Sequence, residues 1–450
     1  GAGIAGLAFA VALNAFDSEK KFAIDLYEAV SELSEIGAGI NVWPRTWQIL
    51  EEIGLGQTLI PHLDHYPDLE HRVVFEIRKA DQENGVKITD VMKDGGVLRI
   101  HRADFQTSLI KHLPLPASSV KINSTCNLHL SHRLVDYGSN STCTSEAQQR
   151  GSLLLYFSDK PTSACDILVG ADGIKSTLRQ LFLARLPGPD KYQIFHDPVW
   201  SGSIAYRGIV DKNDLQKIFP NHRALNHAGL MYFGKRKHTV VYPISSGRFL
   251  NVVAVVHDKS KEGMTWEGPW NQEVTQDEFF GKFSGWEEEF QALIRCIRRP
   301  TRWALQSLNH LDIFAKDRVF LIGDSAHAMV PYQGAGAAAG IEDAYILAAL
   351  LTQCSQLSMC RMSRLAQVYN SMRVPAAIAL SKASADQGDL YNLEGPGFEC
   401  FKEGDYIPRE QLVELFRIVE QKWSWTASDP QLDRIRATEL LQDSKSQARL

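Results

Sequence analysis

The chain has 450 residues, with a hydrophobic share of 44 % and a charged share of 22 %, which are typical of globular domains. Its 48 basic and 53 acidic residues give a net charge of -5, so the basic excess that attracts nucleic acid or an anionic membrane surface is absent. The longest apolar segments, Phe249–Val256 and Ala344–Leu351, are far shorter than the ~20 residues of a membrane-spanning helix, so no membrane span is expected.

Seven scattered cysteines without a CxxC pair predict reduced thiols and a cytoplasmic location, with no zinc or disulfide framework and no other metal site. The chain begins at Gly1, which lies inside a motif. We therefore expect an N-terminal piece carrying the first strand to precede it, and a targeting signal stays open. The sequence does not decide between a monomer and a homodimer.

The first motif is the glycine pattern Gly1-x-Gly3-x-x-Gly6, which runs into a helix of small residues. In a dinucleotide-binding loop the first glycine makes a tight turn, the second lets the backbone approach a pyrophosphate, and the third lets the helix pack on the sheet. An apolar strand, Phe22–Tyr27, follows and ends at Glu28, where an acid binds a ribose. The pattern predicts a dinucleotide site, and a tight helix–strand packing joint is the alternative.

Helices and strands alternate after this motif and then give way to a β-rich centre. Residues 42–60 predict a helix that ends near Gly54, residues 71–79 and 95–101 predict strands, and Arg102–Leu113 predicts a helix. The polar stretch 136–151 is expected to be an exposed hairpin loop. Four strand-like runs follow, as in an antiparallel sheet: Gly202–Val210, Gly229–Phe233, Thr239–Ile244 and Phe249–Val256. This order predicts a discontinuous dinucleotide domain with an inserted substrate domain.

Two further motifs follow short buried strands. The strand Arg318–Ile322 leads into Gly323-Asp324, and the chain continues through Pro331-Tyr332-Gln333-Gly334-Ala335-Gly336-Ala337 into a long helix. An Asp at the end of a strand can hold a polyol hydroxyl, and glycines at a helix start let its N–H groups approach a flat ring. The other strand, Asp166–Gly170, leads into Asp172-Gly173.

These three motifs, in this order, resemble the single-component FAD-dependent aromatic hydroxylases with the p-hydroxybenzoate hydroxylase fold, above all salicylate hydroxylase and its fungal relatives. Four shorter segments also resemble that family: His101–Asp104, Ala205–Gly208, His238–Pro243 and Trp423–Trp425. The resemblance implies an α/β fold with a Rossmann-type FAD-binding domain in three parts (1–75, 101–185 and 301–375). Residues 76–100 and 186–300 would form an inserted antiparallel-sheet substrate domain, and 376–450 a C-terminal helical segment.

The resemblance also implies which residues bind FAD. The phosphates would lie on Gly1, Gly3 and Gly6, and the adenosine ribose on Glu28. Arg102 would reach the ribityl–phosphate region, Asp324 would hold ribityl hydroxyls, and Asp172 would support the FAD site and the encounter with NAD(P)H. The residues expected beside the flavin ring are Asn41, Pro331, Tyr332, Gly334, Gly336 and Ala337.

The implied reaction is the hydroxylation of a small aromatic substrate. NADH or NADPH reduces FAD, dioxygen forms a flavin C4a-hydroperoxide, and this species hydroxylates a phenolic acid, with salicylate converted to catechol and decarboxylated as the leading case. The ring must react as a phenolate, so a base or a cation is needed near its hydroxyl. His238 and Tyr242, four apart on one strand, are expected to line one cavity wall, and Arg207 could pair with a phenolate or carboxylate.

Structural roles stay open for each catalytic candidate: a core tyrosine for Tyr242, an exposed strand start for His238 and a surface ion pair for Arg207. Two other functions are also open. The chain could be a fungal secondary-metabolite phenol hydroxylase or dearomatase, which would start from the same phenolate, or a non-catalytic flavin-binding paralogue.

Three other polar features have expected roles outside the chemistry. We expect His327 to be structural, Arg45 to face either phosphate or solvent, and Glu287–Glu289 to form a solvated face. Trp43 and Trp47 are expected to pack in the core.

Overall fold

The computed structural model describes residues 1–33, 39–115, 126–139, 153–226, 229–244, 247–354 and 357–443. Most of the predicted hairpin loop, residues 140–151, lies outside these ranges. The strands on either side of it, β7 (Leu134–Ser139) and β8 (Leu153–Phe157), pair antiparallel, and β8 also pairs with β9 (Lys160–Cys165). Within the described ranges, no helix is both long and apolar enough to cross a membrane.

The glycine motif lies between two small sheets, each built on a parallel strand pair. One sheet pairs β1 (Ile24–Tyr27) with β6 (Cys126–His129), and the other pairs β10 (Leu168–Gly170) with β18 (Val319–Leu321), which is joined on its far edge by the antiparallel strand β17 (Ala315–Lys316). The Ala2 N–H donates to Glu28, directly after β1, and a Cβ built on Gly1 would be 2.3 Å from the carbonyl oxygen of Ala171, directly after β10. The motif therefore sits where the carboxyl ends of both sheets meet, the place where α/β folds bind ligands.

The central β-rich region forms an eight-stranded sheet in the order β15-β16-β11-β14-β13-β12-β3-β4. All its neighbours are antiparallel except β12 and β3. In chain order the strands are β3 (His71–Lys79), β4 (Val86–Asp94), β11 (Val199–Asp211), β12 (Leu230–Gly234), β13 (Lys237–Ile244), β14 (Phe249–Glu262), β15 (Asn271–Glu273) and β16 (Thr301–Ser307). The predicted antiparallel block is thus present, joined by two earlier strands.

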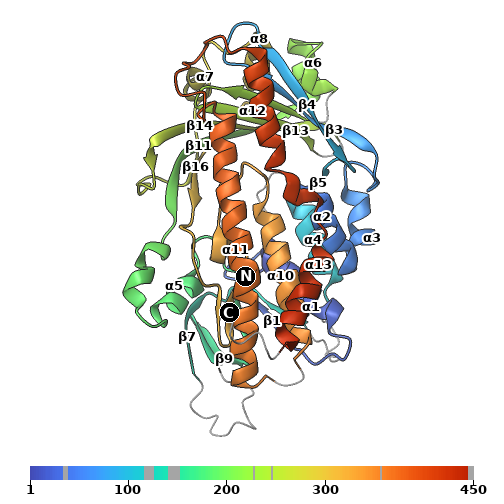
Figure 1. Ribbon diagram of the computed structural model, residues 1–450, viewed down its shortest axis with the longest axis vertical. Coiled ribbons are helices and arrows are strands. Elements are labelled where there is room, and N and C mark those ends of the chain that lie inside the picture. Colours follow the sequence, from blue (N-terminus) through green and yellow to red (C-terminus); the bar gives the residue numbers. More distant parts are fainter. Residues whose placement is uncertain are drawn as a thin grey trace.

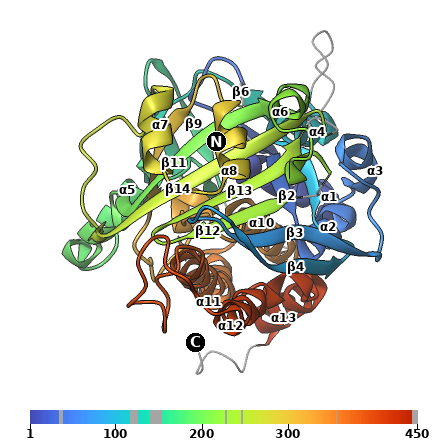
Figure 2. The same cartoon turned by 90° about the horizontal axis from the view of Figure 1, so that it is seen from above.

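Two layers of helices cover the two faces of this sheet. Short helices α6 (Lys212–Ile218), α7 (Gln276–Lys282) and α8 (Glu288–Arg295) lie over the outer face, where they bury one apolar cluster (Figure 2). The long helix α11 (Met359–Tyr391) rises from the dinucleotide side and ends against the inner face, with Tyr391 packed on Phe233 of β12 at 4.9 Å (Figure 1). The inner face therefore looks toward the dinucleotide motif.

The remaining helices surround the two small parallel sheets and the end of α11. Helix α10 (Gly336–Thr352) is the long helix predicted after the second glycine motif, and it packs against α1 (Ile4–Phe16). The short pair β2 (Gly39–Val42) and β5 (Leu98–His101) leads into α4 (Arg102–His112). The other helices are α2 (Pro44–Glu52), α3 (Gly56–Leu59), α5 (Thr177–Ala184), α9 (Asp324–His327), α12 (Arg409–Gln421) and α13 (Pro430–Gln442).

Two expectations about charged residues are wrong. Glu287 and Glu289 are 5 % and 8 % exposed, because they bond Arg78 and Arg223 at the edge of the large sheet. Arg45 faces neither phosphate nor solvent, since its guanidinium donates to Glu342 at 2.8 Å and to Asp433 at 2.6 Å. Buried charges need such partners. The partners lie between 66 and 388 residues away in the chain, so the local sequence did not reveal them.

The prediction of a buried tryptophan pair is confirmed. Trp43 and Trp47 are 1 % and 7 % exposed, but they enter different clusters. Trp43 packs under the large sheet against Trp423, at 6.0 Å between ring centres. Trp423 of the late Trp-Ser-Trp segment is therefore part of the core beneath the inner face, and Trp425 packs against that core.

Candidate active site

The glycine loop has open space beside Gly3 and a tight backbone contact at Gly6. A Cβ on Gly3 would meet no atom within 4 Å, whereas a Cβ on Gly6 would lie 2.0 Å from the carbonyl oxygen of Gly1. Gly3 is also the N-cap of α1, which has no side-chain hydrogen bond there. Free N–H groups beside open space at a helix N-terminus fit a phosphate group.

Glu28 fixes this loop and faces the same space. Its carboxylate accepts the Ala2 N–H at 2.8 Å and the Val30 N–H at 3.2 Å. Burial alone would raise the pKa of Glu28, but the backbone N–H groups that donate to it outweigh burial and lower it. The ionised carboxylate keeps lone pairs free for the hydroxyls of a ribose.

Asp324 and Asn41 come together with the glycines of the second motif. A Cβ built on Gly336 would lie 4.0 Å from the exposed carboxylate of Asp324. A Cβ built on Gly334 would lie 3.4 Å from the side-chain amide nitrogen of Asn41. The Asn41 Oδ1 atom is buried and has no hydrogen-bond partner among the described residues. A buried acceptor without a partner calls for a ligand. This part of the site therefore fits the ribityl chain and ring of FAD.

A buried ion cluster holds the turn that carries Asp324. Gly323 adopts φ of +60°, and its N–H donates to Asp343 at 2.8 Å. Asp343 also bonds His327 at 2.5 Å and Arg373 at 2.7 Å. Burial raises the pKa of Asp343, but these two partners lower it to about 2. His327 thus has the structural role that we predicted.

The other predicted FAD residues lie around this cleft in different ways. Arg102 begins α4 with an exposed side chain, close enough to Arg207 to lower its pKa. Asp172 accepts the Ser176 hydroxyl and the Leu178 N–H and so anchors the start of α5. Its carboxylate is thereby used within the protein, which favours a supporting role.

Tyr242 and Arg207 lie together on the inner face of the large sheet. The Tyr242 hydroxyl donates to the carbonyl of Gly39 at 3.3 Å, and burial raises its pKa although Arg207 and Arg99 oppose this shift. The Arg207 guanidinium is half-buried, lies 5.2 Å from the Trp303 ring, and has no carboxylate partner in the described ranges. Burial lowers its pKa, and the charge of Arg102 adds to this effect. The surface ion pair considered for Arg207 is therefore not seen.

Two residues near Tyr242 were not predicted from the sequence. Arg99 is buried, bonds Asp64 at 3.3 Å, and lies 5.9 Å from the Tyr242 ring. Asn251 is the register partner of Tyr242 on β14, and its buried side-chain amide lies close enough to the Tyr242 hydroxyl to lower the pKa of that group. A lone amide inside the apolar run Phe249–Val256 was the available signal. With Arg207, these groups surround Tyr242 with two guanidinium cations, one of them paired with Asp64, and an amide.

His238 shares the strand face of Tyr242, but the structure does not place both on one open wall. It is 1 % exposed, and the rings of Tyr332 and Tyr391 cover it at 5.1 and 5.3 Å. Its Nδ1 lies 2.7 Å from Oδ1 of Asn392, and burial lowers its pKa to about 4. The reading of His238 as an exposed strand start is wrong. Its imidazole is neutral at pH 7, with Nδ1–H directed at Asn392 and the lone pair left on Nε2.

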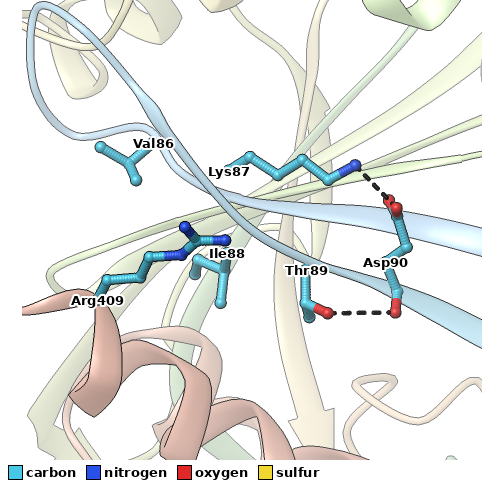
Figure 3. Close-up of a pocket in the computed structure, with 6 residues that line it drawn as sticks. All are labelled: Val86, Lys87, Ile88, Thr89, Asp90 and Arg409. Atoms are coloured by element: carbon cyan, nitrogen blue, oxygen red, sulfur yellow. Dashed lines mark hydrogen bonds and ion pairs between the residues drawn. The ribbon is translucent and has the colours of Figure 1, made fainter.

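A surface pocket elsewhere on the large sheet does not belong to this cleft. It is lined by Val86, Lys87, Ile88, Thr89 and Asp90 of β4 and by Arg409 of α12 (Figure 3). Lys87 donates to Asp90 at 2.8 Å, so these two charges already satisfy each other.

Comparisons with known proteins match this geometry. The FAD binding domain family model matches residues 1–384. Salicylate hydroxylase of Pseudomonas putida is 34 % identical over 401 residues, covering 88 % of this chain and 86 % of that protein. 6-Methylsalicylate 1-monooxygenase of Aspergillus terreus is 29 % identical over 404 residues, covering 87 % and 82 %. A solved salicylate hydroxylase substrate complex has a TM-score of 0.77 at 29 % identity, covering 97 % of this chain and 96 % of that one. The predicted α/β fold is confirmed.

Proposed function

We propose that the substrate of this protein is a small phenolic acid, given that the chain belongs to the FAD-binding-domain family. Within that family it is an FAD-dependent aromatic monooxygenase of the salicylate hydroxylase type. The observation that carries this proposal is Arg207, whose guanidinium lacks a carboxylate partner in the described chain and lies beside Tyr242. A half-buried cation without a counterion favours an anionic ligand. Salicylate is the leading candidate, converted to catechol with loss of the carboxylate.

Each residue has a separate part in this proposal. FAD, when bound, supplies the redox chemistry between NADH or NADPH and dioxygen. Gly3, Glu28 and Asp324 would hold its phosphates, ribose and ribityl chain, and Asn41 would contact its ring. Arg207 binds the carboxylate or phenolate of the substrate, since its planar fork matches two oxygens.

Tyr242 and His238 are the two candidates for acting on the phenolic hydroxyl, Tyr242 as a hydrogen-bond donor to the phenolate and His238 as the base. The Tyr242 hydroxyl stays protonated at neutral pH because burial raises its pKa, so it would donate its one proton to a phenolate in exchange for its present acceptor, the Gly39 carbonyl. His238 keeps a lone pair on Nε2, which suits a base, but Tyr332 of the glycine-rich segment packs on its ring. We propose that Tyr332 separates His238 from the substrate, so that proton transfer to His238 requires Tyr332 to move.

The proposal is tested by comparing the parent with Arg207→Gln in salicylate-dependent NAD(P)H oxidation. The neutral side chain should raise KM for salicylate at least about tenfold, because a charge-assisted bidentate pair is lost. FAD content should not change. Arg298→Gln is the control, since the side chain of Arg298 is 82 % exposed and its ion pair is with Asp214 at the surface. An unchanged KM in Arg207→Gln would contradict the assignment.

A further inference from the structure

A second polar cluster lies where β14 approaches the end of α11, apart from the residues assigned above. His257 is 6 % exposed, and its Nε2 atom has no hydrogen-bond partner among the described residues. The buried Oε2 atom of Glu394 also has no hydrogen-bond partner among the described residues. Together with Asp389, these residues offer one nitrogen and two oxygens within 4.8 Å of one another. Two buried groups that face each other without bonding are costly unless a third group joins them.

The distances in this cluster are those of ligands around an ion. Nε2 of His257 lies 3.7 Å from Oε2 of Glu394 and 3.5 Å from Oε1 of Glu262. Both are longer than a hydrogen bond, whose donor–acceptor distance is about 2.7–3.2 Å. Two ligands that are each ~2.0–2.1 Å from a tetrahedral zinc ion are about 3.4 Å apart. We propose that His257, Asp389 and Glu394, with Glu262 or water as the fourth ligand, bind a zinc-class divalent cation.

The surroundings orient the ligand atoms toward a common point. Glu394 uses Oε1 to accept Arg236 at 3.1 Å, and Asp389 uses Oδ2 to accept Lys259 at 2.9 Å. Each carboxylate therefore keeps its other oxygen for an ion. Metal-binding carboxylates and histidines are held by such outer hydrogen bonds.

The other nitrogen of His257 links the cluster to the FAD cleft. Nδ1 lies 2.9 Å from the hydroxyl oxygen of Ser203, and the same oxygen accepts the hydroxyl of Tyr332 at 2.7 Å. An ion on Nε2 fixes the proton on Nδ1, which then donates to Ser203. A bound cation would therefore tie β14, the end of α11 and the glycine-rich segment together.

The cluster has an entry path and a ligand set that matches its proposed ion. The side chain of Glu262 is 47 % exposed, so the site opens to solvent at one edge. Imidazole and carboxylate ligands suit zinc, whereas magnesium prefers oxygen ligands alone. The scattered cysteines exclude a thiolate zinc framework, but they do not bear on this set.

The test uses the FAD-loaded full chain, stripped with a chelator and dialysed against Zn²⁺ or Mg²⁺, with bound metal measured by mass spectrometry. We expect a single Zn²⁺ per chain, no bound Mg²⁺, and a higher Tm with Zn²⁺. His257→Asn keeps an amide near Ser203 but removes Nε2, and it should weaken Zn²⁺ binding at least about tenfold, as should Glu394→Gln. Asp389→Asn provides a third variant if one of these fails to fold.

His71→Asn is the matched control, because His71 forms an exposed pair with Asp94 at 2.8 Å and should leave Zn²⁺ binding unchanged. Zn²⁺ binding that is equal in the parent and His257→Asn would overturn the proposal. A parent that binds no Zn²⁺ and whose Tm does not respond would also overturn it.

Discussion

Alanine at Gly3 and at Gly6 should separate cofactor binding from folding. Gly3 has φ of -73° and ψ of 178°, which alanine adopts readily, and its Cβ would meet no atom within 4 Å. Gly3→Ala should therefore leave the apoprotein as stable as the parent, or more stable by about 0.4–1 kcal/mol. The new methyl group fills the space in front of α1, so FAD affinity should fall at least about tenfold, or ~1.4 kcal/mol.

Gly6→Ala should act on the fold itself. Its Cβ would lie 2.0 Å from the carbonyl oxygen of Gly1, and the backbone must yield by about 1 Å before the contact reaches 3.0 Å. Overpacking of this kind costs about 1–3 kcal/mol. Urea unfolding of the apoproteins measures the stability difference, and titration of flavin fluorescence measures FAD affinity.

Gly281→Ala is the control for both measurements, because Gly281 is exposed in α7 and its Cβ would meet nothing within 4 Å. The reasoning is refuted if Gly3→Ala binds FAD with the parent's affinity. It is also refuted if Gly3→Ala loses as much stability as Gly6→Ala.

Asp343→Asn should lower the free energy of unfolding by about 3–5 kcal/mol, because it removes the anion that neutralises two buried cations. Urea unfolding measures this loss. The control is Glu288→Gln, which changes an exposed acid and should alter the free energy of unfolding by less than about 0.5 kcal/mol. An equally small loss in Asp343→Asn would refute the prediction. Asp324→Ala should elute without FAD on gel filtration, and a yellow variant would count against the ribityl role. His238 has its pKa lowered from 6.5 to about 4, so stability should rise with pH across this window by about 3 kcal/mol. His238→Gln should flatten that rise in unfolding measured at several pH values, and an unchanged slope would show that His238 does not cause it.

Local sequence patterns were sufficient for the elements that depend on neighbours in the chain. The glycine spacing placed α1, Gly54 ended α2 with a φ of +89°, and the strand 71–79 was found at its observed limits. Period-two alternation located β11 to β14, although each strand extends beyond its predicted run. Strand β4 was missed because its exposed face carries charges that mask the alternation.

Long-range partners decided the features that sequence reasoning missed. The acids at 287 and 289 look solvated in the chain, yet they are buried because Arg78 and Arg223 meet them across the sheet edge. His238 follows three basic residues and looks exposed, yet the end of α11 covers it and Asn392, 154 residues later in the chain, bonds its ring. Asn251 gains significance only through its register opposite Tyr242. Such pairings follow from topology, which no local window contains.

The most direct test of the account is product analysis with the FAD-loaded enzyme, NADH or NADPH, dioxygen and salicylate. The account predicts that catechol forms in step with the NAD(P)H consumed, and that Arg207→Gln loses this product at salicylate concentrations that saturate the parent. NAD(P)H oxidation that yields only hydrogen peroxide with every phenolic acid tried would contradict it.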